Sequence, residues 1–365
     1  MVDFSTHLSR VRELLAEKGL NTLIVMGSSN IQYLIGSDAP SAAVVSFDDV
    51  VTLSSRLEFT RTLDEAKHGK HFTYLKEGDV AEYENAIFGG FYDALKKLLE
   101  GAGKGGWGYA GLSQETRRRL EEELGSAGVD LTKDFLTLRR RKDPSEVEAL
   151  RSAARVAERA LAKAIAMLET GITEAEVAAE ITSCITRCGC EPSFPPIVAF
   201  GEHSAHPHAK PSLRKLRRGD PVKMDLGARV DGYCSDLTRT LTYGGCYGKF
   251  QGKFWAVLKA QERAIEIIKP GVQAREVHMT AVETLRREKL LMYFNHGLGH
   301  GVGLDIHEEP YLNAEATTSL LPGDVVTVEP GIYVHGTFGI RIEDMVLVTE
   351  QGPEVLTSFP KLLSL

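Results

Sequence analysis

An internal repeat in the second half of this chain limits its possible folds more than any other feature. The segment ALAKAIAMLETGITEAEV, starting at Ala160, aligns with AQERAIEIIKPGVQAREV, starting at Ala260, after a shift of one hundred positions. Each copy predicts a helix, a glycine turn at Gly171 or Gly271, a capped second helix and then strands. The alternative is a chance match between two helical segments. If the repeat is real, it predicts a pseudo-twofold domain whose halves close around a central cleft, a common place for a functional site.

The first 135 residues have a different pattern, in which short apolar runs alternate with helical segments. Strand-like runs occur in NTLIV, AAVVSF, VVTLSS, HFTYL and residues 107–110. Helices are expected from about residue 8 to a stop at Gly19, from about residue 58, and over residues 83–99. This alternation predicts a small α/β domain over residues 1–135.

The boundary between the domains falls in LRRRKDPSEVEAL. Asp143 has the properties of a helix cap, Pro144 suits the first turn, and Glu146 completes a capping box. We therefore expect a helix over residues 144–168 that opens a second domain, of α+β type, over residues 136–365.

Size and charge narrow the class of protein. A chain of 365 residues is long enough for two domains with full hydrophobic cores. The net charge of −7 argues against nucleic acid as the main partner. The N-terminus lacks an apolar signal core, and no segment reaches the roughly 20 apolar residues that a membrane span needs. These features predict a cytoplasmic protein without a membrane partner.

Residues 222–241 predict a β-hairpin that carries two aspartates. Asp231-Gly232 between β-prone runs is a strong turn signal. With these residues at the turn, Asp225 pairs with Thr238, and Asp236 lies two residues further along on the same face. The two carboxylates are then diagonal neighbours that can converge on metal ions. The alternative is a pair of solvated carboxylates on an edge strand.

Three further segments add imidazoles and carboxylates. His296, His300 and His307 lie within twelve residues that include four glycines, which allow close backbone approach to a ligand. Glu329 ends one β-branched run and Glu343 interrupts another, where a charge is costly unless it is paired or coordinated. The alternative for each glutamate is a salt bridge to an arginine, Arg341 or Arg239. A proline-rich loop also carries three histidines, whose spacing does not choose among them: His203, His206 and His208.

The four carboxylates named above and one imidazole form a set of oxygen and nitrogen ligands. Such a set suits two hard-to-borderline divalent cations better than one structural zinc. If the fold brings the five together, the chain is a two-metal hydrolase. The five residues are Asp225, Asp236, His300, Glu329 and Glu343.

Together these motifs resemble the creatinase, prolidase and aminopeptidase P branch of metallopeptidase family M24, which has the pita-bread fold. The resemblance covers nearly the whole chain, because residues 7–36 are similar to the creatinase-type N-terminal domain. The resemblance implies that Asp225 chelates the first metal, that Asp236 and Glu343 bridge both, and that His300 and Glu329 hold the second. The expected ions are two divalent cations per subunit, Mn²⁺ first, with Co²⁺ or Zn²⁺ as alternatives.

The resemblance also implies roles in catalysis and binding. Glu329 is the expected general base, and His208 rather than His206 contacts the scissile peptide. His307 is expected to stabilise the tetrahedral intermediate. His296 and Arg341 match substrate-pocket residues.

The expected activity is hydrolysis of the Xaa-Pro bond in small peptides with proline in second position. Tyr311 stands where some prolidases have an arginine, which weakens the case for a strict dipeptidase, although Arg341 could replace it. We expect an Xaa-Pro dipeptidase, with aminopeptidase P as the alternative. A creatinase-like hydrolase and a non-catalytic binding homologue are remote alternatives. The family also suggests a homodimer, in which Asp38 approaches the partner's cleft and holds the substrate ammonium.

Overall fold

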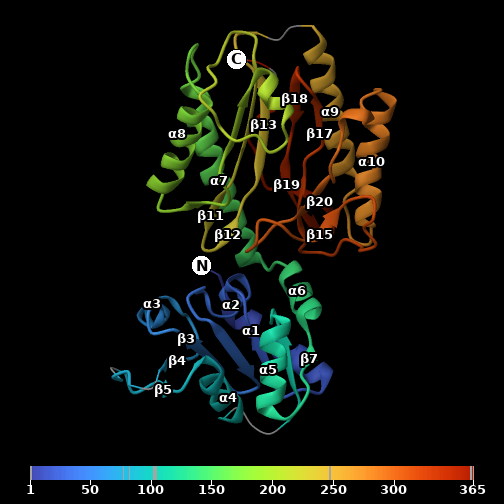
Figure 1. Ribbon diagram of the computed structural model, residues 1–365. Helices are drawn as coiled ribbons and strands as arrows, with labels where there is room; N and C mark the ends of the chain where they lie inside the picture. The colour runs from blue at the N-terminus through green and yellow to red at the C-terminus, as the bar shows by residue number, and fades with distance from the viewer. Residues whose placement is uncertain are drawn as a thin grey trace. The chain divides into compact units, whose positions relative to one another are not determined.

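The chain forms two compact units, Met1–Arg139 and Arg140–Leu365. The computed structural model describes residues 2–76, 78–81, 83–101, 105–245, 248–361 and 364 (Figure 1). No helix in this described part combines the length and apolar character needed to cross a bilayer.

The first unit is built around a mixed seven-stranded sheet in the order β5-β4-β3-β2-β1-β6-β7. Its centre is apolar, with Ile24, Val44 and Leu53 fully or almost fully buried. Its strands are β1 (Thr22–Val25), β2 (Ala42–Ser46), β3 (Val50–Ser54), β4 (Lys70–Leu75), β5 (Ala86–Phe88), β6 (Trp107–Ala110) and β7 (Val129–Asp130). Its helices are α1 (Phe4–Lys18), α2 (Ser28–Ile35), α3 (Phe59–Glu65), α4 (Phe91–Gly101), α5 (Gln114–Leu124) and α6 (Thr132–Arg140).

Most of the expected elements of this unit are present. Helix α1 ends at Gly19, which has the left-handed backbone (φ +64°) expected at a helix stop. The prediction of one long helix over residues 83–99 was wrong. Strand β5 takes part of that stretch, and α4 begins only at Phe91. Gly89 has φ +127°, a conformation that breaks a helix, and the Asp93 carboxylate accepts the Gly90 N–H.

The second unit repeats one arrangement of two helices in both halves. Helices α7 (Pro144–Ala166) and α8 (Glu174–Arg187) have counterparts in α9 (Lys249–Glu266) and α10 (Ala274–Arg287). Helices α7 and α9 end one hundred residues apart. Helices α8 and α10 also begin, and end, one hundred residues apart. The backbone amides of Gly171 and Gly271 donate to Leu216 and Leu320, each at 2.9 Å. The repeat is therefore structural, and the chance match is excluded.

Each pair of helices covers its own strands, as Figure 1 shows in green and orange. The first half contains β8 (Glu191–Pro192), β9 (Ile197–Phe200), β10 (Pro221–Leu226), β11 (Ala228–Val230), β12 (Tyr233–Cys234) and β13 (Leu237–Thr242), with the 3₁₀ helix η1 (Gly201–Ala205). The second contains β14 (Gly299–Gly301), β15 (Glu308–Leu312), β16 (Val325–Val328), β17 (Gly331–Val334), β18 (Phe338–Arg341), β19 (Asp344–Thr349) and β20 (Gly352–Val355), with η2 (Leu291–Tyr293).

The two halves have separate apolar cores made of matching positions. Ala164 and Val177 are fully buried in the first core, and Ala264 and Val277 are fully buried in the second. Helix α7 starts with the expected capping box at Asp143 and ends two residues earlier than expected. Burial of these equivalent faces explains why the repeat is visible in the sequence.

Candidate metal and substrate site

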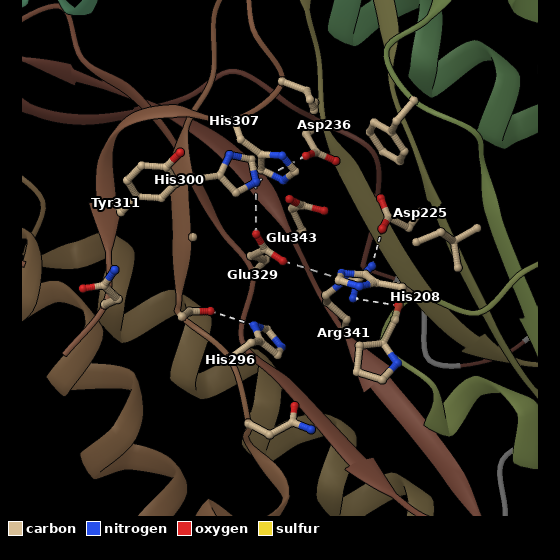
Figure 2. A pocket seen from close by; sticks show the side chains of 18 of the residues that line it. His208, Asp225, Asp236, His296, His300, His307, Tyr311, Glu329, Arg341 and Glu343 are labelled. Carbon is tan, nitrogen blue, oxygen red and sulfur yellow. Dashed lines mark hydrogen bonds and ion pairs between the residues drawn. The ribbon is translucent and has the colours of Figure 1, made fainter. Parts of the chain in front are cut away.

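A cavity of about 740 Å³ lies in the second unit and is lined by residues from both of its halves (Figure 2). All but one of the residues expected to bind metal, act in catalysis or bind substrate line this cavity. They are His208, Asp225, Asp236, His296, His300, His307, Tyr311, Glu329, Arg341 and Glu343. The exception is Asp38, which belongs to the first unit and forms an ion pair with Arg61.

The two aspartates come from the predicted hairpin. Its register is confirmed, because Asp225 pairs with Thr238 in β10 and β13. Asp231 and Gly232 form the turn with positive φ angles of 50° and 85°. The prediction missed that the hairpin is split between two three-stranded sheets. At the split, a Cβ on Gly227 would lie only 1.8 Å from the Ser235 carbonyl oxygen.

The other three expected ligands come from strands of the second half. His300 lies in β14, Glu329 follows β16, and Glu343 lies between β18 and β19. The His300 Nε2 atom is 3.3 Å from Glu329 Oε1 and 3.6 Å from Asp236 Oδ2. Glu343 accepts a hydrogen bond of 2.6 Å from the Thr238 hydroxyl, so the halves also meet through this bond.

The donor atoms of this cluster fit divalent cations. One ligand atom from each of Asp236, His300 and Glu343 lies within 4.8 Å of the others. Asp225 Oδ1, Asp236 Oδ1 and Glu343 Oε1 are buried with no hydrogen-bond partner among the described residues. Buried polar atoms normally have partners. Three such carboxylate oxygens beside an imidazole therefore suit cations that prefer oxygen and nitrogen ligands.

The electrostatics of the cluster also favour bound divalent cations. Burial and the nearby carboxylate of Glu343 raise the pKa of Asp236 well above its usual range. Burial and the charge of Glu329 do the same to the pKa of Glu343. Burial also acts to raise the pKa of Glu329, but the hydrogen bond and charge of His300 outweigh it and hold that pKa at about 2. Bound cations would relieve this crowding of negative charge.

The expected salt bridges to the two glutamates are only partly present. The Arg341 Nε atom lies 3.9 Å from Glu329 Oε2. Arg239 instead donates to the backbone carbonyl of Glu343 and pairs with Asp344 at 2.7 Å. Neither contact satisfies the Glu343 carboxylate, so a salt bridge does not account for this buried charge.

The histidines of the proline-rich loop separate into two environments. His203 is bonded through Nδ1 to the buried carboxylate of Glu174 at 2.8 Å. His206 and His208 instead line the cavity. Across the cavity, the ring of His307 packs edge-on against His300 with centroids 4.2 Å apart.

Arg341 is held mainly by the protein itself. It pairs with Asp225, and its Nη1 donates to the Tyr333 hydroxyl at 2.9 Å and to the Pro207 carbonyl at 3.2 Å. Its Nε donates to Thr238 at 3.1 Å. Of the five N–H groups of an arginine, few remain for a substrate.

Two residues of this network were missed from the sequence. Lys223 is fully buried on β10, two positions before Asp225, and Tyr333 joins Arg341 to His296 through its hydroxyl. Burial lowers the pKa of Lys223 and raises the pKa of Tyr333 to about 12. A lysine that shares a face with Asp225 in an otherwise apolar strand was the available signal.

Together the two similar halves and the shared ligand cluster define a candidate two-metal hydrolase. The profile of metallopeptidase family M24 matches residues 148–350, and that of the creatinase/prolidase N-terminal domain matches residues 7–140. The chain belongs to metallopeptidase family M24, as its motifs predicted.

Similar proteins cover almost the whole chain. An Xaa-Pro dipeptidase from Pyrococcus furiosus is 33% identical over 353 residues, which are 96% of this chain and 97% of the relative. The solved structure of an Xaa-Pro dipeptidase from Bacillus anthracis has a TM-score of 0.88 and 29% identity, with 100% of both chains covered. That of an X-Pro aminopeptidase from Thermotoga maritima has a TM-score of 0.86 and 28% identity, with 98% of this chain and 100% of the other covered. The predicted pita-bread fold is confirmed.

Proposed function

We propose that this chain is a two-metal exopeptidase that hydrolyses the Xaa-Pro bond of dipeptides. The observation that carries the proposal is the cluster of four carboxylates and one imidazole, drawn from both halves of the fold into one cavity. The similarity to Xaa-Pro dipeptidases of two organisms supports the choice of substrate.

The five clustered side chains would hold the metals. In this proposal Asp225 would hold the first cation, His300 and Glu329 would hold the second, and Asp236 and Glu343 would serve both. Mn²⁺ is the proposed ion, and Co²⁺ and Zn²⁺ suit the same ligands. When bound, the cations supply Lewis-acid polarisation of the scissile carbonyl and lower the pKa of a water molecule.

The remaining work falls to the chain's own groups. The hydrogen bond and charge of His300 keep Glu329 ionised at neutral pH, and this carboxylate is the proposed acceptor of a proton from the attacking water. His208 and His307 line the cavity and can donate hydrogen bonds to negative charge that develops on the substrate. Proline offers no amide N–H, so its ring must be recognised by shape, for which His296 supplies part of the wall.

Peptide length is the open choice within this activity. Tyr311 lines the cavity, and its phenol is neutral near pH 7, so it offers no charge to a C-terminal carboxylate. Arg341 lines the cavity as well, although most of its donors are already used. These features limit any preference for dipeptides to a modest one and keep aminopeptidase P activity as the second candidate.

Turnover of Xaa-Pro and Xaa-Pro-Xaa peptides by Mn²⁺-, Co²⁺- and Zn²⁺-loaded protein tests the proposal. We expect dipeptides to be cleaved at least about 10-fold faster, because one charge-assisted contact gives about 10- to 100-fold preference. Equal or faster cleavage of tripeptides would reassign the chain to the aminopeptidase P type. No cleavage of either class with any of the three metals would refute the proposal.

Metal removal separates the remote alternatives. A creatinase-like hydrolase would stay active after thorough chelation, whereas the proposed peptidase would not. A non-catalytic homologue would take up no metal, whereas calorimetric titration of the metal-free protein should show uptake near two equivalents.

We also propose a homodimer in which Asp38 approaches the partner's cleft and binds the substrate ammonium. Asp38→Ala should then raise KM for dipeptides without changing metal uptake. An Arg61→Ala control removes the ion-pair partner of Asp38 and should not raise KM. An unchanged KM in Asp38→Ala would remove Asp38 from the site.

A further inference from the structure

Lys223 is a buried cation in an unusual setting. Its side chain lies on β10 and is fully buried, and its Nζ donates to two backbone carbonyls, those of His206 at 2.5 Å and Pro207 at 3.2 Å. The ring centroid of Tyr333 lies 5.1 Å from the same nitrogen. Two carbonyls and a ring face account for the three N–H bonds of an ammonium group. Burying a lysine amino group is costly unless it is hydrogen-bonded, and the two carbonyls offset part of that cost.

The Pro207 carbonyl is held from two sides. Lys223 donates to it from β10, and Arg341 donates to it through Nη1 at 3.2 Å from the end of β18. These two strands belong to different halves of the unit. The bond from Pro207 to His208 is a planar peptide unit, so a clamp on this carbonyl also fixes the direction in which the backbone of His208 begins.

His208 depends on this backbone for its position. Its side chain is exposed to the cavity, and no described residue forms a hydrogen bond with its ring. Proline limits rotation just before it. The peptide unit that Lys223 and Arg341 hold therefore sets the point and direction from which the His208 side chain projects.

We propose that Lys223 is a positioning residue that clamps the Pro207–His208 peptide unit and thereby directs the His208 imidazole into the cavity. This inference rests on the proposed peptidase function, in which His208 acts on the substrate. It assigns to Lys223 no contact with substrate or metal.

Lys223→Met keeps the length of the side chain and removes the ammonium, and Lys210→Met makes the same change at an exposed lysine of the same loop. We expect Lys223→Met to lower kcat about 10- to 100-fold with KM changed less than about threefold, because a displaced catalytic group costs rate more than binding. Metal uptake should stay near two equivalents. Lys210→Met should match the wild type.

A double-mutant cycle asks whether Lys223 acts through His208. In a His208→Ala background, Lys223→Met should lower kcat by less than about threefold, because the group that it positions is gone. An undiminished loss in that background, or an unchanged kcat in Lys223→Met alone, would overturn the inference. If Lys223→Met does not fold, as judged by circular dichroism, Lys223→Leu, which also lacks a donor, takes its place in the cycle.

A crystal structure of the variant separates this inference from the proposed function. If the wild type cleaves no Xaa-Pro peptide, the proposed function fails, yet the clamp still predicts a changed position of residues 206–208 in Lys223→Met. An unchanged loop in that structure would refute the clamp even if the wild type is an active peptidase.

Discussion

The two halves of the second unit share a backbone framework but differ in the side chains that they add to it. After both α7 and α9 the chain turns at a glycine. The first backbone amide of the next helix then donates a hydrogen bond to a carbonyl later in the same half: Glu174 to Arg214 at 3.2 Å, and Ala274 to Thr318 at 2.9 Å. These hydrogen bonds join backbone groups, so they do not depend on the side chains. The two halves differ in the side chain at the first position of the second helix.

Glu174 and Ala274 are that pair. The Glu174 carboxylate is fully buried and accepts hydrogen bonds from the Phe200 amide and from the amide and hydroxyl of Ser212. It thereby orders the loop that carries His206 and His208. Ala274 has no polar side chain, so it makes no equivalent bonds to the strands and loops of the second half. The comparison teaches that a duplicated backbone framework can carry a buried, loop-ordering carboxylate in one half and an apolar residue at the same position of the other.

The largest expected effect tests whether both halves supply the metal site. Asp236→Asn removes a ligand from the first half, and Glu343→Gln removes one from the second. Each should lower kcat/KM at least about 1000-fold, because metal ions stabilise the transition state by several kcal/mol. Each should also reduce calorimetric metal uptake below two equivalents. If only one of the two variants loses activity, the site does not draw on both halves.

The next effect compares the catalytic imidazoles of the two halves, His208 in the loop before β10 and His307 in the loop between β14 and β15. His208→Ala and His307→Ala should each lower kcat about 100- to 1000-fold, the usual loss for one group that stabilises developing charge. Metal uptake should not change in either. His206→Ala should cost less than about fivefold, and a larger loss there would exchange the roles of the two loop histidines.

A stability effect follows from the contrast between Glu174 and Ala274. Glu174→Ala leaves the buried amide of Phe200 and the partly buried amide of Ser212 without acceptors, at about 1–3 kcal/mol for a buried one and less for the other. We expect the free energy of unfolding in urea to fall by about 3 kcal/mol, with kcat reduced as the loop loosens. Ala274→Gly, the matched change in the second half, should cost about 1 kcal/mol and leave kcat unchanged. Equal losses in both variants would contradict the contrast.

The smallest effect concerns the helix caps. Thr173 caps α8 and forms a capping box with Glu176, whereas Gln273 makes no side-chain cap bond at α10. Thr173→Ala should cost about 1 kcal/mol, and Gln273→Ala should change the free energy of unfolding very little.

The cap also predicts a dependence on pH. Hydrogen bonds with Thr173 lower the pKa of Glu176 below its ordinary value of 4.5. The stabilisation is therefore complete above that value and is lost as the pH falls through the lowered pKa. The difference between wild type and Thr173→Ala in urea unfolding should shrink in acid, and a difference that grows in acid would be inconsistent with the capping box.

Much of the framework was predictable because its causes are local. Asp231-Gly232 determined the hairpin register, Asp143 marked the start of α7, and the repeat spacing matched α8 and α10. The prediction of a long helix over residues 83–99 was wrong because it followed the helical spacing of apolar residues and ignored Gly89. The positive φ of Gly89 ends the strand before α4.

The site was only partly predictable, because its contacts join residues far apart in the chain. The ligand types could be read from short motifs, but their roles came from the resemblance to M24 peptidases. Lys223 was overlooked because its partners are backbone carbonyls of another segment. Nothing in the sequence near Glu174 indicates that its carboxylate orders residues 200–212. Such long-range hydrogen bonds leave no periodic trace.

Gly227, where the hairpin passes from one sheet to the other, has a consequence for engineering. The Ser235 carbonyl fills the space that a side chain at Gly227 would need. The two backbone segments of the hairpin are therefore in direct contact at this point, which lies between Asp225 and Asp236 in the chain. The spacing of the two aspartates thus depends on a position that tolerates no added carbon. Attempts to adapt this scaffold to a larger metal pair should leave this crossing untouched and alter the strands of the opposite half.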